Sequence, residues 1–226
     1  MAYKRPVASA RLPRGDELTA AMAGIGMNFA ATPDADANIE DTLVAASVEA
    51  LERADLRVLA MLTTWLGVHH PWVNVDRLSR AVRAVGACEA DRVRAFWASV
   101  GRWLSKDRRF ARLIGLYRGQ PIDLLPTGTA FHVRRAGEDE RFAGAPLRVP
   151  ANVLRDRAAD VLTPAELARR HRAYRQRVLM GPTYRADMWA ALERDPSLSA
   201  AALARQAYGS FATAWQVKHD RALLGS

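Results

Sequence analysis

Five polar or charged side chains near the C-terminus are of types that can contact nucleic acid. They are Ser210, Thr213, Gln216, Lys218 and Arg221. The amide of Gln216 can make a bidentate contact with an adenine edge, and the hydroxyls of Ser210 and Thr213 suit phosphates or bases. Lys218 and Arg221 are better suited to phosphates. Together they could contact DNA, provided that one helix presents them.

The surrounding stretch, residues 197–221, predicts two short helices joined by a tight turn. Ser199 is placed to cap the first helix, because its side chain can accept an orphan backbone N–H. Residues 200–207 are rich in strong helix formers, residues 208–210 interrupt the pattern, and a helical pattern resumes over 211–224.

The spacing resembles the helix-turn-helix family. Ala204 is the small residue in the first helix, Gly209 marks a turn five residues later, and Ser210 and Thr213 open the second helix. The resemblance implies that the second helix enters the DNA major groove and that its N-terminal residues touch base edges. The alternative is a structural helical hairpin with a polar surface.

A helix before this motif completes the expected C-terminal core. Thr183 is placed to cap a helix over 184–194, and the Asp195-Pro196 turn then leads into residues 197–221. The predicted core of this part consists of Leu192, Leu198, Leu203, Phe211, Ala214 and Val217.

An arginine-rich helix is predicted from Thr163 to about Met180. Thr163, Pro164 and Glu166 have the order of a capping box with proline at the first helical position. Arg169 and Arg172 are spaced i, i+3 and can share a face that contacts phosphates. The alternative is a solvated helix, or one that pairs with acids of the N-terminal segment.

Catalytic and metal-binding patterns are sparse. His69 and His70 lie near Asp76, but adjacent histidines seldom ligate one ion and no HExxH spacing is present. We interpret them as part of a polar connection beside an aromatic core. The six tryptophans are interpreted as core residues, and the single cysteine, Cys88, excludes an internal disulfide. The sequence therefore predicts no enzyme activity, no metal and no cofactor.

The middle of the chain predicts three helices and then two strands. The helices are expected at 55–66, 75–85 and 89–104, and the strands at 111–117 and 130–134. Three helices followed by a β-ribbon is also the element order of a winged helix. The resemblance extends over residues 55–135 and implies a second DNA-binding module there.

Charge is distributed unevenly along the 226 residues. The net charge is +9, yet residues 1–56 carry 5 basic and 9 acidic side chains, against 14 and 8 in 57–140 and 14 and 7 in 141–226. An anion-binding surface is therefore expected in the last two thirds. No apolar run reaches the roughly 18 residues of a membrane span, and no secretory signal is evident, so we expect a cytoplasmic protein without membrane contact.

The expected fold is mainly α, with a small central β-ribbon and a C-terminal helix-turn-helix domain. The predicted divisions are a basic arm and acidic helical segment at 1–54, a helical domain with the ribbon at 55–150, and the basic helix with the helix-turn-helix at 151–226. Asn38 is placed to cap a helix in the acidic segment.

Two segments also resemble antitoxins encoded beside nucleotidyltransferase toxins: DLRVLAMLTTWLGVHH and YGSFATAWQVKHD. Two functions follow as hypotheses. The first is a transcriptional regulator that binds double-stranded DNA, as an antitoxin and autorepressor of its operon, with a toxin as partner and a homodimer as one arrangement. The alternative is a protein-binding antitoxin or adaptor without sequence-specific DNA readout.

Overall fold

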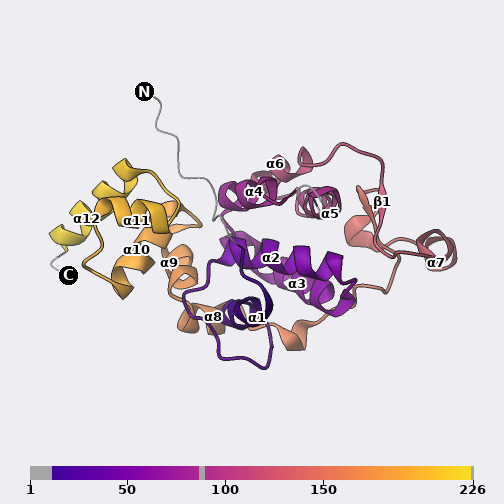
Figure 1. The fold of residues 1–226 in the computed structure, drawn as a ribbon, viewed down its shortest axis with the longest axis horizontal. Helices are drawn as coiled ribbons and strands as arrows, with labels where there is room; N and C mark the ends of the chain where they lie inside the picture. The colour runs from indigo at the N-terminus through magenta and orange to yellow at the C-terminus, as the bar shows by residue number, and fades with distance from the viewer. Residues whose placement is uncertain (1–11, 87–89, 225–226) are drawn as a thin grey trace.

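The computed structural model describes residues 12–86 and 90–224, and it is mainly helical (Figure 1), as predicted. Cys88 and most of the predicted basic arm lie outside these residues. The α-helices are α1 (Gly15–Gly24), α2 (Ile39–Glu52), α3 (Leu56–His69), α4 (Val75–Arg83), α5 (Ala90–Trp103), α6 (Ala111–Ile114), α7 (Thr129–Ala136), α8 (Pro164–Arg170), α9 (Arg172–Met180), α10 (Tyr184–Arg194), α11 (Ala200–Gln206) and α12 (Phe211–Leu223). The strands are β1 (Ile122–Asp123) and β2 (Leu147–Arg148), and short 3₁₀ turns lie at His70–Trp72, Arg108–Phe110, Glu140–Phe142 and Ala158–Asp160.

The helix starts that the sequence predicts are confirmed. Asn38 accepts a hydrogen bond from the backbone N–H of Asp41 at 3.0 Å, which caps α2. Thr163 and Glu166 form a reciprocal capping box at the start of α8. Thr183 caps α10 and Ser199 caps α11, each by accepting a hydrogen bond from one backbone N–H of its helix. These short polar side chains satisfy N–H groups that have no partner within the helix, so their effect is local and readable from sequence.

One hydrophobic core extends from Leu18 in α1 to Tyr174 in α9. Two fully buried tryptophans connect its layers. Trp65 of α3 donates from Nε1 to the carbonyl of Ile25 at 2.7 Å, and Trp97 of α5 donates to Ser47 of α2 at 3.0 Å. The core therefore does not divide at residue 54 or at residue 150. A second, smaller cluster lies between α10, α11 and α12.

The two predicted strands at 111–117 and 130–134 are wrong. The first segment forms the short helix α6, and the second forms α7. Within the described residues, β1 and β2 are the only named strands, and they pair in parallel over two residues. The ribbon expected of a winged helix is thus not present there. Alternation over five residues was too short a pattern to distinguish a strand from a helix turn.

The predicted helix from Thr163 to Met180 is two helices. His171 interrupts it with extended backbone (φ −118°, ψ 112°), ending α8 and capping α9. Its Nδ1 accepts from the N–H of Tyr174 at 3.1 Å, and its Nε2 donates to the buried carbonyl of Ala37 at 2.9 Å. This second contact, to a residue 134 positions away, could not be seen in the local pattern.

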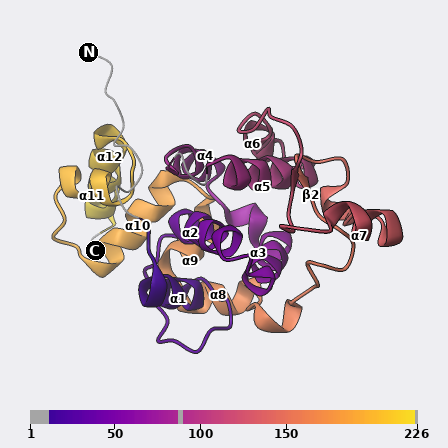
Figure 2. The same ribbon diagram turned by 45° about the vertical axis from the view of Figure 1, so that its right-hand side comes forward.

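The helices are arranged along one long axis. Helices α10, α11 and α12 form one end, and α7 lies at the opposite end (Figures 1 and 2). The body between them contains α1 to α6, α8 and α9. None of the helices in the described part of the chain is long and apolar enough to cross a membrane.

Gly101 sets the distance between α5 and α6. A Cβ atom there would lie 2.9 Å from Leu113 Cβ and 3.0 Å from the backbone nitrogen of Ile114. We expect Gly101→Ala to lower the free energy of unfolding by about 1–3 kcal/mol, because backbone atoms must move. Gly67→Ala in α3 is the matched control, since its Cβ would meet only Trp103 at 3.7 Å, and it should be neutral or stabilising. Urea unfolding of both variants measures the difference; equal effects would contradict this account of the packing.

Candidate nucleic-acid interface at the C-terminal helices

The C-terminal helices have their own small core. Met188 and Leu192 of α10 pack with Leu203 of α11 and with Ala214 and Val217 of α12. Four of the predicted core residues are therefore confirmed: Leu192, Leu203, Ala214 and Val217. Leu198 is partly buried against the same cluster.

The prediction for Phe211 is wrong, because 46% of its surface is exposed. Phe211 is the first residue of α12, and successive helical positions are turned by about 100°. Phe211 is therefore turned by about 60° from Ala214 and about 120° from Val217, which places it at the edge of the face that packs on α10 and α11. Trp215, which was expected in the core, is 55% exposed on the same outer side.

The turn between α11 and α12 is close to α10. Tyr208 has a positive φ of 56°, and a Cβ on Gly209 would lie 2.3 Å from the methyl carbon of Met188 and 3.3 Å from Tyr184 Cβ. Glycine thus lets the chain turn directly over α10. The turn predicted at residues 208–210 is present, and Ser210 is the N-cap of α12.

Ser210 and Thr213 are engaged in this cap. The Ser210 hydroxyl accepts from the Thr213 backbone N–H at 3.1 Å, and the two hydroxyls lie 2.7 Å apart. Both side chains are half-buried. Their first role is therefore to start α12, which orients the residues that follow.

Gln216 is exposed on α12 and bonded to an acid one turn later. Its Nε2 donates to Asp220 at 2.8 Å, and Asp220 also pairs with Arg185 of α10 at 2.8 Å. The Arg185 hydrogen bond, followed by the one from Gln216, lowers the pKa of Asp220 below its ordinary value. Lys218 donates to the backbone carbonyl of Leu198, and Arg221 is half-buried in the last turn.

Arg169 and Arg172 do not join this surface. Arg169 is exposed on α8, which lies beside α1 and away from α12 (Figures 1 and 2). Arg172 of α9 pairs with Asp36 at 2.8 Å. Pairing with acids of the N-terminal segment was the alternative interpretation of this arginine-rich region, and Arg172 fits it.

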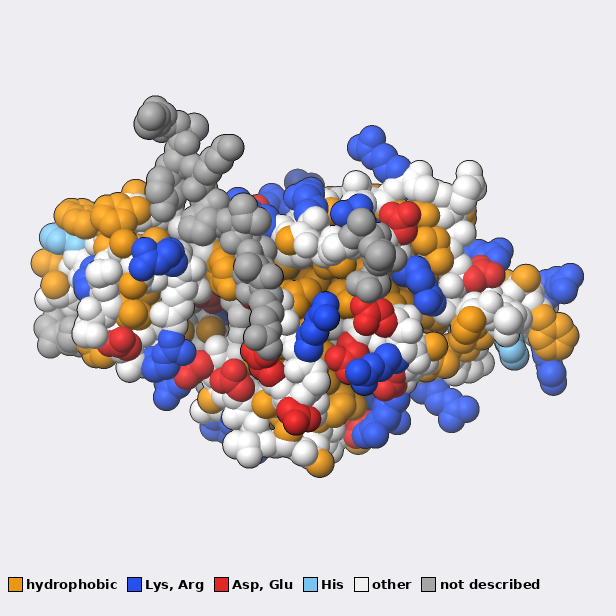
Figure 3. Space-filling model, in the orientation of Figure 1, with side chains coloured by type: hydrophobic (Ala, Val, Ile, Leu, Met, Phe, Trp, Pro, Cys, Tyr) orange, Lys and Arg blue, Asp and Glu red, His pale blue; other side chains and the backbone are white. Residues whose placement is uncertain are grey.

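An aromatic stripe on α12 was missed from the sequence. Phe211, Trp215 and His219 are spaced four residues apart and share the outer face of the helix. The Trp215 and His219 rings stack with centroids 5.5 Å apart and planes 2° from parallel. Hydrophobic surface gathers over this end of the molecule in Figure 3. The i, i+4 spacing was legible, but only packing shows that the opposite face is the buried one.

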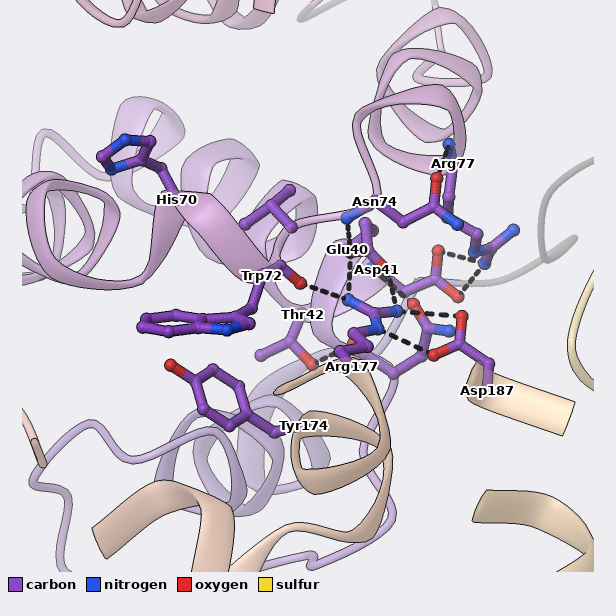
Figure 4. Close-up of polar contacts among 12 residues, drawn as sticks. Glu40, Asp41, Thr42, His70, Trp72, Asn74, Arg77, Tyr174, Arg177 and Asp187 are labelled. Carbon is purple, nitrogen blue, oxygen red and sulfur yellow. Dashed lines mark hydrogen bonds and ion pairs between the residues drawn. The ribbon is translucent and has the colours of Figure 1, made fainter. Parts of the chain in front are cut away.

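Arg177 is the centre of a buried charge network between the body and the C-terminal helices (Figure 4). Its Nη1 and Nη2 donate to Glu40 of α2 at 2.6 and 2.9 Å. Its Nε and Nη2 donate to Asp187 of α10 at 2.7 and 3.0 Å. Burial opposes the charged guanidinium, but the two carboxylates outweigh it and raise the pKa of Arg177 above its ordinary value.

A second pair extends the network to the turn before α12. Arg77 of α4 donates to both oxygens of Asp41, at 2.6 and 2.5 Å. The Tyr208 ring lies over the Arg77 guanidinium, with 3.2 Å from Cζ to the ring centroid, and the Tyr208 hydroxyl donates to Asp41 at 3.4 Å. Burial raises the pKa of Asp41, although Arg77 opposes the shift. The turn is therefore attached to α2 and α4.

Both ring nitrogens of His69 are engaged inside the fold. His69 is fully buried, with Nε2 3.0 Å from the Leu162 carbonyl and Nδ1 2.7 Å from the Tyr174 hydroxyl. A carbonyl can only accept, so Nε2 carries the proton and Nδ1 accepts from Tyr174. Among the described residues, no group of three or more His, Cys, Asp or Glu side chains is placed to hold a metal ion.

Comparisons of the chain with models of protein families, with curated proteins and with solved structures found no match.

Breaking the Arg177 network should destabilise the whole protein. Arg177→Met leaves Glu40 and Asp187 buried without their cation, so we expect a loss of about 3–5 kcal/mol in the free energy of unfolding. Arg175→Met, two residues earlier in α9, removes only an exposed pair with Glu193 and should cost under about 1 kcal/mol. Chemical denaturation compares the two. Similar losses would show that the buried network does not carry this stability.

Stability should fall as the pH falls from about 6.5 to about 4. Burial lowers the pKa of His69 from its ordinary 6.5 to about 4, so in this window the unfolded chain binds a proton that the folded protein does not. The stabilisation is complete above pH 6.5 and up to about 3 kcal/mol is lost by pH 4. Denaturant unfolding at several pH values should show a shallower slope for His69→Gln. His132→Gln, at an exposed histidine, should keep the wild-type change of unfolding free energy with pH. If His69→Gln keeps it too, His69 is not the cause of the pH dependence.

Proposed function

We propose that this protein is a cytoplasmic DNA-binding transcriptional regulator in which α12 enters the major groove. The observation that carries the proposal is the unit formed by α10, α11 and α12. It has a core of its own, a tight turn at Gly209 and a second helix capped at Ser210. A helix-turn-helix requires these features. The net charge of +9 favours a polyanionic partner.

The outer face of α12 has one polar side chain that can contact base edges, Gln216, beside apolar side chains. Gln216 is exposed and held by Asp220, a geometry in which its amide can meet an adenine edge. Phe211 and Trp215 can contact thymine methyl groups. The phosphates would be contacted by Lys218, by Arg221 and by Arg205, which is exposed at the end of α11. A site rich in A·T pairs fits this face better than one rich in G·C pairs.

A single motif reads only a few base pairs, so we propose that two copies bind one operator. Repression of the protein's own operon, as an antitoxin beside a toxin partner, is the biological setting that we favour. In the complex with the operator, Arg169 is a candidate for contact with the DNA phosphates because it is exposed. Arg172 would first have to break its ion pair with Asp36.

A protein-binding antitoxin or adaptor is the second candidate. It is favoured by Phe211 and Trp215, whose exposed rings supply the kind of aromatic surface that protein interfaces use. The pairing of Arg172, Arg175 and Arg177 with acids supports it as well, because those cations are not available to phosphates.

Selection of bound duplexes from a random-sequence pool tests the first candidate. We expect an A·T-rich site to emerge, and Gln216→Ala to reduce its discrimination at one adenine position by about 5- to 100-fold. Gln120→Ala, at an exposed glutamine in the body, should change nothing. If no sequence is enriched, and Trp215→Ser instead abolishes a complex with the co-expressed product of the neighbouring gene, the second candidate replaces the first.

A further inference from the structure

Helix α7 projects from the body at the end opposite α12 (Figures 1 and 2). Thr129 is its only buried residue. The helix is held at its two ends. The Thr129 hydroxyl accepts from the N–H of Leu125 at 3.2 Å, and the carbonyl of Gly137 accepts from the N–H of Ala151 at 2.9 Å. Between these ends Val133 is half-buried and the other side chains are exposed.

This helix adds little to the stability of the fold. Eight residues are too few for an isolated helix to be stable in water, so the two attachments must maintain it. Phe131 is 55% exposed and belongs to neither hydrophobic core. The Phe131 ring and the cations that follow it in α7 are therefore accessible to a partner.

The charge around Phe131 is positive. Between 129 and 136 the chain has Arg134, Arg135 and His132 and no acid. Three of the flanking acids have partners: Asp123 pairs with Arg148 at 2.6 Å, Asp139 pairs with Arg141 at 2.6 Å, and Glu138 accepts from the N–H of Gly144 at 2.9 Å. Glu140, four residues after α7, is exposed. At the right-hand tip of Figure 3, a hydrophobic side chain is seen between two cationic ones, with a histidine beside it.

We propose that α7 binds duplex DNA, with Arg134 and Arg135 on phosphates and Phe131 inserted as a wedge between base pairs. Apolar wedges flanked by cations are one way in which proteins grip and kink the minor groove. A membrane surface fits less well, because α7 exposes one large apolar side chain instead of an apolar face.

The contact adds to the proposed DNA-binding function but does not depend on base reading by α12. Phosphate contacts and wedge insertion are largely independent of sequence. A duplex of mixed sequence therefore tests α7 alone, whereas the selected A·T-rich site tests α12.

Fluorescence anisotropy with a labelled mixed-sequence duplex, measured across a salt series, tests the phosphate contacts. Arg134→Ala/Arg135→Ala should weaken binding and reduce the slope of log K against log salt by about 2, because two phosphate contacts are lost. Arg83→Ala/Lys106→Ala removes two exposed cations elsewhere in the body and should leave the slope nearly unchanged. Equal changes in the two double variants would overturn the proposal, since net charge alone would then explain them.

The wedge is tested with 2-aminopurine placed in the same duplex. Wild-type protein should raise its fluorescence by unstacking it. Phe131→Ala should abolish the rise and weaken binding by roughly tenfold without altering the salt slope, and Phe131→Leu should restore part of both. Their unfolding midpoints should match wild type. Unchanged fluorescence and affinity in Phe131→Ala, tighter binding to single-stranded DNA, or binding to phosphatidylserine vesicles but not to DNA would each overturn the proposal.

Discussion

The buried guanidinium of Arg177 is the interaction on which the arrangement of this protein depends. It lies between Glu40 in the first turn of α2 and Asp187 in the first turn of α10, and it is fully buried. The two carboxylates stabilise a cation that has no access to water, which favours the observed packing of α2, α9 and α10. The Asp41–Arg77–Tyr208 contacts extend this constraint to the turn that starts α12. These contacts inside the body help to set the orientation of α12, together with the small core between α10, α11 and α12.

Many of the arginines that make this chain basic are used internally. Arg77 and Arg177 are buried, and Arg172 and Arg175 pair with acids at the surface. A net positive charge therefore does not by itself describe a single phosphate-binding face. Exposed cations remain on the body, among them Arg83, Lys106 and Arg169. At the two ends of the long axis, α7 and α12 combine exposed aromatic rings with nearby cations or amides. At both ends the exposed residues contribute little to the stability of the folded protein.

Helices α7 and α12 are each held in place by few contacts, which leaves side chains on their outer faces exposed. α12 is oriented by a serine cap, a glycine turn and a small hydrophobic core, and α7 by one threonine and a backbone hydrogen bond. In each case the apolar residue that protrudes has no partner within the described core. Binding energy can then be gained from a ligand without first breaking contacts of the free protein.

The sequence alone determined the helix starts, because capping residues act within three positions of themselves. Asn38, Thr163, Thr183, Ser199 and Ser210 were all legible for that reason. It also determined the mainly helical class and most of the C-terminal core. Only the tertiary structure decided that Phe211 faces solvent, that 130–134 lies in a projecting helix, and that His171 interrupts the arginine-rich helix. The interruption at His171 depends on the carbonyl of Ala37, 134 residues earlier in the chain. The projecting helix is attached through Ala151, and the orientation of Phe211 follows from the packing of α12 on α10 and α11. Local periodicity carries no information about which distant group will satisfy a buried charge or carbonyl.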